Sequence, residues 1–211
     1  ILIFVSTGRC GTVRLTEILK KNLSDQFSVA HQLQISRLAN IIGNILFYFN
    51  NNNSFKAKLY NKVLKHKKTD YFISTDPLTS MIIPKELICS EDVAIIHIYR
   101  DLNDFATSFY KFSRKKPFSF IAHNFIPFWQ IKILPLQNLL LGKKITNKYK
   151  KTANIKNEWF VENYKKNKYF LSINMKDVFN TNTIEKTINE FFGTSETIVT
   201  QDFKIKSNTS K

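Results

Sequence analysis

Two groups of residues have the types and spacing needed to bind a phosphorylated ligand. The first follows an apolar run at residues 1–5 and reads Ser6-Thr7-Gly8-Arg9-Cys10-Gly11-Thr12. Gly8 and Gly11 let the backbone turn tightly and direct N–H groups toward an anion. Arg9 adds a fixed positive charge, and hydroxyl residues stand at both ends of the segment. It therefore predicts a phosphate-binding loop, although the glycine spacing and the missing Lys set it apart from a Walker A loop.

The second group begins where another apolar run, at residues 93–99, ends. Arg100 follows this run directly, and Ser108 comes eight residues later. That spacing is about two turns of the helix expected at residues 102–113. An Arg at a strand end and a Ser on the next helix could hold one phosphate from two sides. The alternative for the same pair is a structural salt bridge and a solvated helix surface.

The elements that must position these groups alternate along the chain. Apolar runs typical of buried strands occur at residues 1–5, 27–30, 71–75, 93–99 and 169–174. Helical periodicity occurs at residues 12–22, 33–49, 102–113 and 183–192. This alternation predicts one α/β domain over residues 1–211, with a central parallel sheet of about four or five strands between layers of helices. Ligands of such sheets bind at the carboxyl ends of the strands, where both groups lie.

Charge is the unusual feature of the composition. There are 32 Lys and Arg residues against 16 Asp and Glu, so the formal net charge is +16. A field of this sign concentrates anionic partners such as nucleotides, nucleic acid, acidic polysaccharide or a membrane surface. Lysines in Asn-rich stretches are also typical of a solvated face. The charge alone therefore predicts an anionic partner without choosing among these classes.

Other features narrow the protein class. Cys10 and Cys89 are too few for a disulfide framework or a metal-ligand cluster. Residues 118–141 are apolar and long, but a Lys and two Pro residues within them argue against a membrane span. No signal peptide is visible. We therefore expect a cytoplasmic protein without a bound metal, and an N-terminal anchor outside the given sequence stays open.

The two phosphate-binding groups together resemble the nucleotide-binding signatures of sulfotransferases that use 3'-phosphoadenosine-5'-phosphosulfate (PAPS). In that family a loop of the form S/T-x-G/P-R/K-S-G-T follows the first strand. A later strand ends in an Arg that holds the 3'-phosphate with a Ser eight residues on. The residues that match are Ser6, Gly8, Arg9, Gly11, Thr12, Arg100 and Ser108, with Cys10 in place of the usual Ser. Residues 169–193 are similar to the family's strand-then-helix ending.

The resemblance implies a P-loop-NTPase-like three-layer sandwich and a complete reaction. A sulfuryl group would pass from PAPS to a hydroxyl or amine of an acceptor, for which a carbohydrate or another anionic molecule is a candidate, and no metal would be needed. Arg9 would stabilise the leaving phosphate, which makes it a catalytic residue. The residues implied in PAPS binding are Ser6, Thr7, Gly8, Arg9, Cys10, Gly11, Thr12, Arg100 and Ser108.

The general base is the point at which the match with the family is least direct. Asp76 stands where many members carry a catalytic His, and His31-Gln32 stands where others carry a Glu. We favour His31, because its ordinary pKa suits proton transfer near neutral pH. Asp76 would need a pKa raised by burial. In the alternative, His31 caps a strand and Asp76 opens a turn before Pro77.

Two other functions remain open from the sequence. A nucleoside-phosphate kinase on the same general fold could use Asp76 as a Mg²⁺ ligand, although its P-loop Lys is missing. A nucleic-acid-binding module could use the basic and aromatic residues at 109–116. The paired signatures favour the sulfotransferase, so we do not expect nucleic acid as a partner. Residues 33–49 and 118–141 are the predicted acceptor-facing segments, and the oligomeric state is open.

Overall fold

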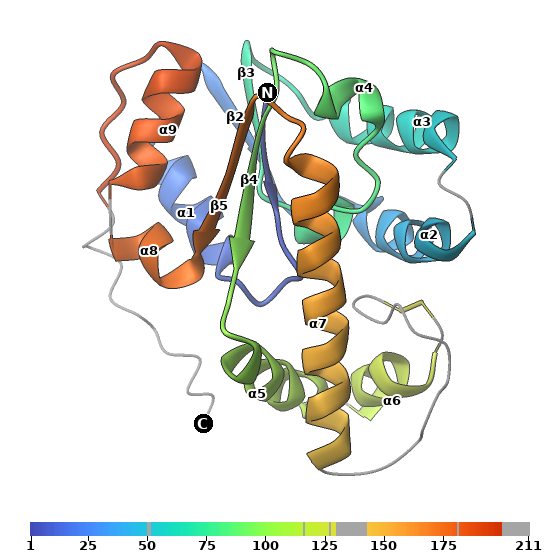
Figure 1. Ribbon diagram of the computed structural model, residues 1–211. Helices are drawn as coiled ribbons and strands as arrows, with labels where there is room; N and C mark the ends of the chain where they lie inside the picture. The colour runs from blue at the N-terminus through green and yellow to red at the C-terminus, as the bar shows by residue number, and fades with distance from the viewer. Residues whose placement is uncertain (50–51, 116, 127, 130–142, 181, 200–211) are drawn as a thin grey trace.

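The computed structural model describes residues 1–49, 52–115, 117–126, 128–129, 143–180 and 182–199 (Figure 1). Five strands form one sheet in the order β2-β3-β1-β4-β5. Every neighbouring pair is parallel. The strands are β1 (Leu2–Val5), β2 (Phe27–Ala30), β3 (Tyr71–Ser74), β4 (Ala94–Tyr99) and β5 (Tyr169–Asn174). The predicted α/β class and parallel sheet are thereby confirmed.

The central strand β1 is buried on both faces. Leu2 and Phe4 point into one hydrophobic core, and Ile3 and Val5 point into the other. None of the four is more than 1% exposed. Such burial explains the uninterrupted apolar run, because a strand covered on both sides gains from an apolar residue at every position.

Helices cover both faces of the sheet, as Figure 1 shows. On the face of Leu2 lie α1 (Thr12–Asn22), α8 (Met175–Asn180) and α9 (Thr183–Phe192). On the face of Ile3 lie α2 (Ser36–Tyr48), α3 (Asn53–Leu64) and the second half of α7 (Lys143–Tyr164). Two short helical segments, η1 (Pro77–Thr79) and α4 (Lys85–Ile88), connect β3 to β4.

A third cluster lies beyond the carboxyl ends of the strands, at the bottom of Figure 1. It consists of α5 (Leu102–Arg114), α6 (Pro117–Phe125) and the first half of α7. Phe105 and Phe109 of α5 pack against Tyr149 of α7. We call this end of the molecule, formed by α5, α6 and the first half of α7, the pole. Because the second half of α7 packs on the sheet, α7 connects the pole to the sheet.

The order of the strands places the topological switch point of the sheet between β1 and β4. The chain leaves β1 toward β2 and returns through β3, whereas β4 and β5 lie on the other side of β1. Connections that diverge from neighbouring strands leave a crevice at their carboxyl ends. Here those are the ends of β1 and β4, which are followed by the two predicted phosphate-binding groups.

The sequence predicted all five strands to within one residue of their observed ends, but it missed several helices. The expected helix at residues 33–49 begins at Ser36, and α3, α4, α7 and α8 had not been predicted. Helix α6 lies in the segment 118–141, for which only an acceptor-facing role had been predicted. Residues 130–142 of the second acceptor-facing segment lie outside the described residues. None of the helices in the described ranges is long and apolar enough to cross a membrane.

Candidate functional site

The loop after β1 has an unusual backbone. Gly8, Arg9 and Gly11 have positive φ angles of 84°, 57° and 73°. Gly11 is also the N-cap of α1, and no side chain caps this helix end. The free N–H groups of the first turn and the positive end of the helix dipole therefore face the loop, which is the arrangement that binds phosphate.

Small polar side chains hold the loop in shape. The Ser6 hydroxyl accepts a hydrogen bond from the Gly8 amide at 3.2 Å, and the Ser6 amide donates to Ser80 Oγ at 3.2 Å. The Cys10 thiol donates to the Gly8 carbonyl at 3.2 Å. Cys10 is completely buried, which raises its pKa to about 11, so it is a neutral thiol near pH 7. These contacts give the loop a fixed geometry before any ligand binds.

Thr7 and Thr12 complete the loop and are also buried. The Thr7 hydroxyl lies 4.0 Å from the Cys10 sulfur. Thr12 is the first residue of α1, and its carbonyl accepts a hydrogen bond from Thr16 Oγ1 at 2.6 Å. The structure thus shows side-chain contacts within the loop for Ser6, Thr7 and Cys10, and for Thr12 it shows a buried position at the start of α1. Direct contact of these four residues with a ligand stays a prediction.

The residues of the two sequence signatures meet in space. Arg9 Nε and Nη2 lie 3.4 and 3.3 Å from Ser108 Oγ and donate to it. Arg100 Nη1 donates to the Arg9 carbonyl at 3.2 Å. The Arg9 guanidinium also lies over the Phe112 ring, 4.8 Å from its centroid. Residues about one hundred positions apart in sequence therefore form one cluster at the ends of β1 and β4.

Among the described residues, no acidic side chain neutralises the positive charge of this cluster. In the described part of the chain, no carboxylate forms an ion pair with Arg9 or Arg100. Arg100 Nε is buried and has no hydrogen-bond partner there. Burial and then the charge of Arg100 lower the pKa of Arg9. Two adjacent guanidinium groups beside an uncapped helix N-terminus favour an anion, because it relieves their repulsion and supplies acceptors for their N–H groups.

An aromatic residue that the sequence reasoning missed lies against the loop. A Cβ atom added to Gly11 would come within 2.8 Å of Phe179 Cε2. The Arg14 guanidinium lies over the Phe179 ring, 4.7 Å from the ring centroid. Phe179 lies in α8, inside the segment that resembles the family ending, but no spacing rule connects it with Gly11. The Phe179 ring therefore packs against the loop at Gly11.

The favoured base, His31, is held in one orientation at the end of β2. Its Nδ1 lies 3.0 Å from the Thr75 carbonyl and 3.2 Å from Thr75 Oγ1. Because a carbonyl oxygen can only accept, Nδ1 carries the proton and Nε2 of the neutral ring carries the lone pair. Nε2 is buried and has no partner among the described residues. His31 therefore has a free proton-accepting atom.

Asp76, the other candidate base, is buried after the end of β3 and accepts a hydrogen bond on each of its carboxylate oxygens. It is 1% exposed. Its Oδ2 accepts from the Ser36 hydroxyl at the start of α2. Its Oδ1 accepts from the Leu78 amide at 3.0 Å and so caps η1. These bonds are those of the turn-opening alternative for Asp76, and its role as a base stays a prediction.

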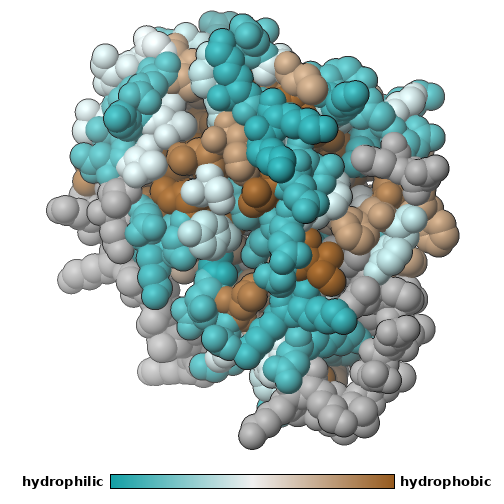
Figure 2. Space-filling model, viewed as in Figure 1, coloured by the Kyte–Doolittle hydropathy of each residue, from teal (hydrophilic) through white to brown (hydrophobic). Residues whose placement is uncertain are grey.

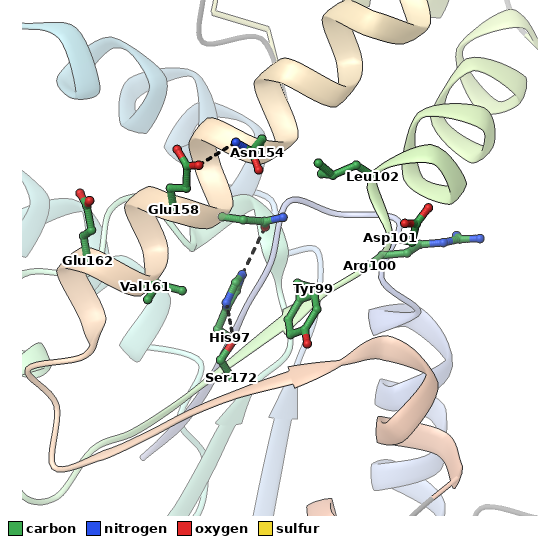
Figure 3. Close-up of a pocket in the computed structure, with 11 residues that line it drawn as sticks. His97, Tyr99, Arg100, Asp101, Leu102, Asn154, Glu158, Val161, Glu162 and Ser172 are labelled. Carbon is green, nitrogen blue, oxygen red and sulfur yellow. Dashed lines mark hydrogen bonds between the residues drawn. The ribbon is translucent and has the colours of Figure 1, made fainter.

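A cavity of about 660 Å³ lies between α7 and the strands β4 and β5 (Figure 3). Figure 3 shows His97 and Ser172 from the strands facing α7, while the Arg100 side chain points away from them. His97 contacts Ser172 and Asn157 at 3.0 and 3.2 Å, and burial lowers its pKa to about 4. Since β2 and β4 are three strand spacings apart, about 14 Å, this cavity is not where His31 would meet an acceptor.

Taken together, two guanidinium groups and an uncapped helix N-terminus lie at the carboxyl edge of a parallel sheet, an arrangement that favours a bound anion. Comparison with known families then identifies the class. The model of the sulfotransferase domain family matches residues 1–135, which is more than half of the 211 residues. The chain belongs to this family. No curated protein matches it significantly. Within the described residues, no group of three or more His, Cys, Asp or Glu side chains could hold a metal ion.

Proposed function

We propose that this chain transfers a sulfuryl group from PAPS to a hydroxyl or amine of its acceptor. The observation that carries the proposal is the convergence of Arg9, Arg100 and Ser108 beside the loop, with no carboxylate paired to either Arg in the described ranges. PAPS has anionic groups at both its 5' and 3' ends. The loop at residues 6–12 and the N-terminus of α1 would bind the 5'-phosphosulfate. Arg100 and Ser108 would bind the 3'-phosphate, which distinguishes PAPS from ATP.

In this arrangement Arg9 links the two ends of the donor. Its backbone belongs to the loop, while its side chain reaches Ser108. As the bond between sulfur and the 5'-phosphate oxygen breaks, negative charge develops on the leaving phosphate. A guanidinium fixed in place before the reaction stabilises that charge. The product would be adenosine 3',5'-bisphosphate.

His31 would accept the acceptor's proton on Nε2 as the new bond from oxygen or nitrogen to sulfur forms. The Thr75 carbonyl would stabilise the resulting imidazolium through Nδ1. Asp76 would keep Ser36 and η1 in place rather than take the proton. Phe179, whose ring carries Arg14 over it, would stack with the adenine base on its other face, an interaction worth about 1–3 kcal/mol for a nucleobase on an aromatic side chain.

Calorimetric titration with adenosine 3',5'-bisphosphate in EDTA tests the proposal. The wild type should bind in the micromolar range without metal. Arg100→Ala should weaken binding roughly 10- to 100-fold, because hydrogen bonds to charged groups contribute about 1.5–3 kcal/mol each. Arg114→Ala is the matched control, because this exposed Arg lies at the far end of α5 and should bind like the wild type. Tight binding of ATP with Mg²⁺ and none of the bisphosphate would overturn the proposal in favour of a kinase.

A further inference from the structure

The positive charge of the chain is concentrated in one quarter of its length. Residues 105–157 contain eleven Lys and Arg residues and no Asp or Glu, so they carry eleven of the sixteen net charges. This stretch includes most of α5, all of α6 and the first half of α7, which together form the pole beyond the strand ends (Figure 1). Figure 2 shows hydrophilic side chains running along α7 toward this pole. Lys111, Arg114 and Lys115 are exposed on it.

Helix α6, at the same pole, buries polar side chains and exposes apolar ones. His123 and Asn124 are only 3% and 8% exposed. The Asn124 side chain accepts a hydrogen bond from the Tyr149 hydroxyl of α7 at 2.9 Å. Phe118 and Ile121, by contrast, are 69% and 50% exposed. Because residues three apart on a helix share one face, these two apolar side chains form a common outward surface.

We propose that this pole docks on the surface of an anionic lipid bilayer, with Phe118 and Ile121 inserted among the lipids and Lys111, Arg114 and Lys115 bound to headgroups. Exposed basic residues beside outward apolar side chains are the combination that binds peripheral proteins to anionic membranes. A nucleic acid or an acidic glycan would match the charge but would leave Ile121 without a partner, since an aliphatic side chain offers no stacking face. The apolar pair therefore favours lipid.

Docking in this way would bring the donor site close to the membrane. Phe112 of α5 contacts Arg9 of the loop and is itself 36% exposed. The opposite end of α7, where Lys165 and Lys166 follow Tyr164, would point away from the bilayer (Figure 1). Docking of this surface does not depend on the proposed reaction, because no residue of the docking surface is one of the proposed donor-binding residues.

Co-sedimentation with vesicles tests the docking. Wild-type protein should bind phosphatidylcholine vesicles that contain phosphatidylserine and bind pure phosphatidylcholine far more weakly. The double variant Phe118→Ser/Ile121→Ser should lose about tenfold or more in vesicle affinity, because two large apolar side chains no longer leave water. Phe55→Ser is the matched control, since Phe55 is 45% exposed on α3, away from the pole, and should bind like the wild type.

The charge is tested in the same assay. Lys111→Glu/Arg114→Glu should weaken binding by at least about twentyfold, because each basic residue near an anionic surface contributes about fivefold. Lys165→Glu/Lys166→Glu removes the same charge at the opposite end and should change affinity less than the pole variant. Unchanged thermal melts would show that the variants are folded, and unchanged titration with adenosine 3',5'-bisphosphate would separate this surface from the donor site.

Two results would overturn the docking proposal. One is a Phe118→Ser/Ile121→Ser variant that binds phosphatidylserine vesicles as tightly as the wild type, since insertion would then contribute nothing. The other is a wild-type protein that binds a single-stranded oligonucleotide tightly and does not bind the vesicles. That result would make nucleic acid the partner of the pole.

Discussion

Replacing Gly11 by Ala tests how the phosphate loop is built. Gly11 has a φ angle of 73° and caps α1. A new Cβ would lie 2.8 Å from Phe179 Cε2 and 3.0 Å from Phe179 Cζ. Gly8 offers a matched comparison, because its φ angle is 84° but a Cβ there would have no heavy atom within 4 Å. The two variants share backbone strain and differ in the clash.

The expected sizes follow from these two contributions. A left-handed conformation costs a non-glycine residue about 1–2 kcal/mol. Ala also lowers the conformational entropy of the unfolded chain, which stabilises the folded state by about 0.4–1 kcal/mol. Gly8→Ala should therefore cost about 1 kcal/mol. Gly11→Ala adds overpacking against Phe179, typically about 1–3 kcal/mol, for a total of about 3 kcal/mol. For a chain of this size the melting temperature should fall by about 2–4 °C and about 6–12 °C respectively.

Urea unfolding and thermal melts of both variants provide the measurement. The double variant Gly11→Ala/Phe179→Leu should lose less stability than the two single changes added together, because the smaller side chain relieves the clash. Equal losses for Gly8→Ala and Gly11→Ala would refute the reasoning, and so would strict additivity in the double variant.

Three further changes test other parts of the account. Burial lowers the pKa of His97 to about 4, below the ordinary 6.5, so the stability it contributes is complete above pH 6.5 and is lost as the pH falls toward 4. In urea titrations across this window His97→Gln should lose up to about 3 kcal/mol less than the wild type. The loss that remains includes that of His123, whose pKa burial also lowers to about 4. Asn167→Ala should cost about 2–4 kcal/mol of unfolding free energy, because its side chain bonds the Ile88 and Val93 carbonyls and the Tyr169 amide; a loss below 1 kcal/mol would contradict this. His31→Gln should lower the rate at which adenosine 3',5'-bisphosphate is released from PAPS by at least about 100-fold, with a simple phenol as surrogate acceptor. The affinity of the variant for adenosine 3',5'-bisphosphate should stay within twofold of the wild type. Unchanged turnover would exclude His31 as the base.

The sequence predicted those parts of the fold that rest on short-range patterns. Strands buried on both faces leave continuous apolar runs, as in β1 and β4, and their ends were predictable to within one residue. That the two signatures would lie at the same edge of the sheet was also predictable, because parallel strands align their carboxyl ends and each signature follows one of them. The particular contact of Arg9 with Ser108 had not been predicted.

What the sequence did not predict depends on partners far along the chain. Helix α7 was missed because its apolar residues are spread among many Lys and Asn residues and serve two different clusters, Tyr149 in one and Phe160 in the other. The position of Phe179 against Gly11 depends on how α8 packs on α1, which no local pattern encodes. The engagement of Asp76 by Ser36 is likewise a tertiary contact.

Recognition of the 3'-phosphate by Arg100 and Ser108 is the central claim, and nucleotide selectivity tests it most directly. Calorimetry should compare adenosine 3',5'-bisphosphate with adenosine 5'-monophosphate on the wild type and on Arg100→Ala. The account predicts that the wild type prefers the bisphosphate by at least about tenfold, as one charged hydrogen-bonding contact would give, and that Arg100→Ala abolishes the preference. Equal affinities for the two nucleotides in the wild type would contradict it.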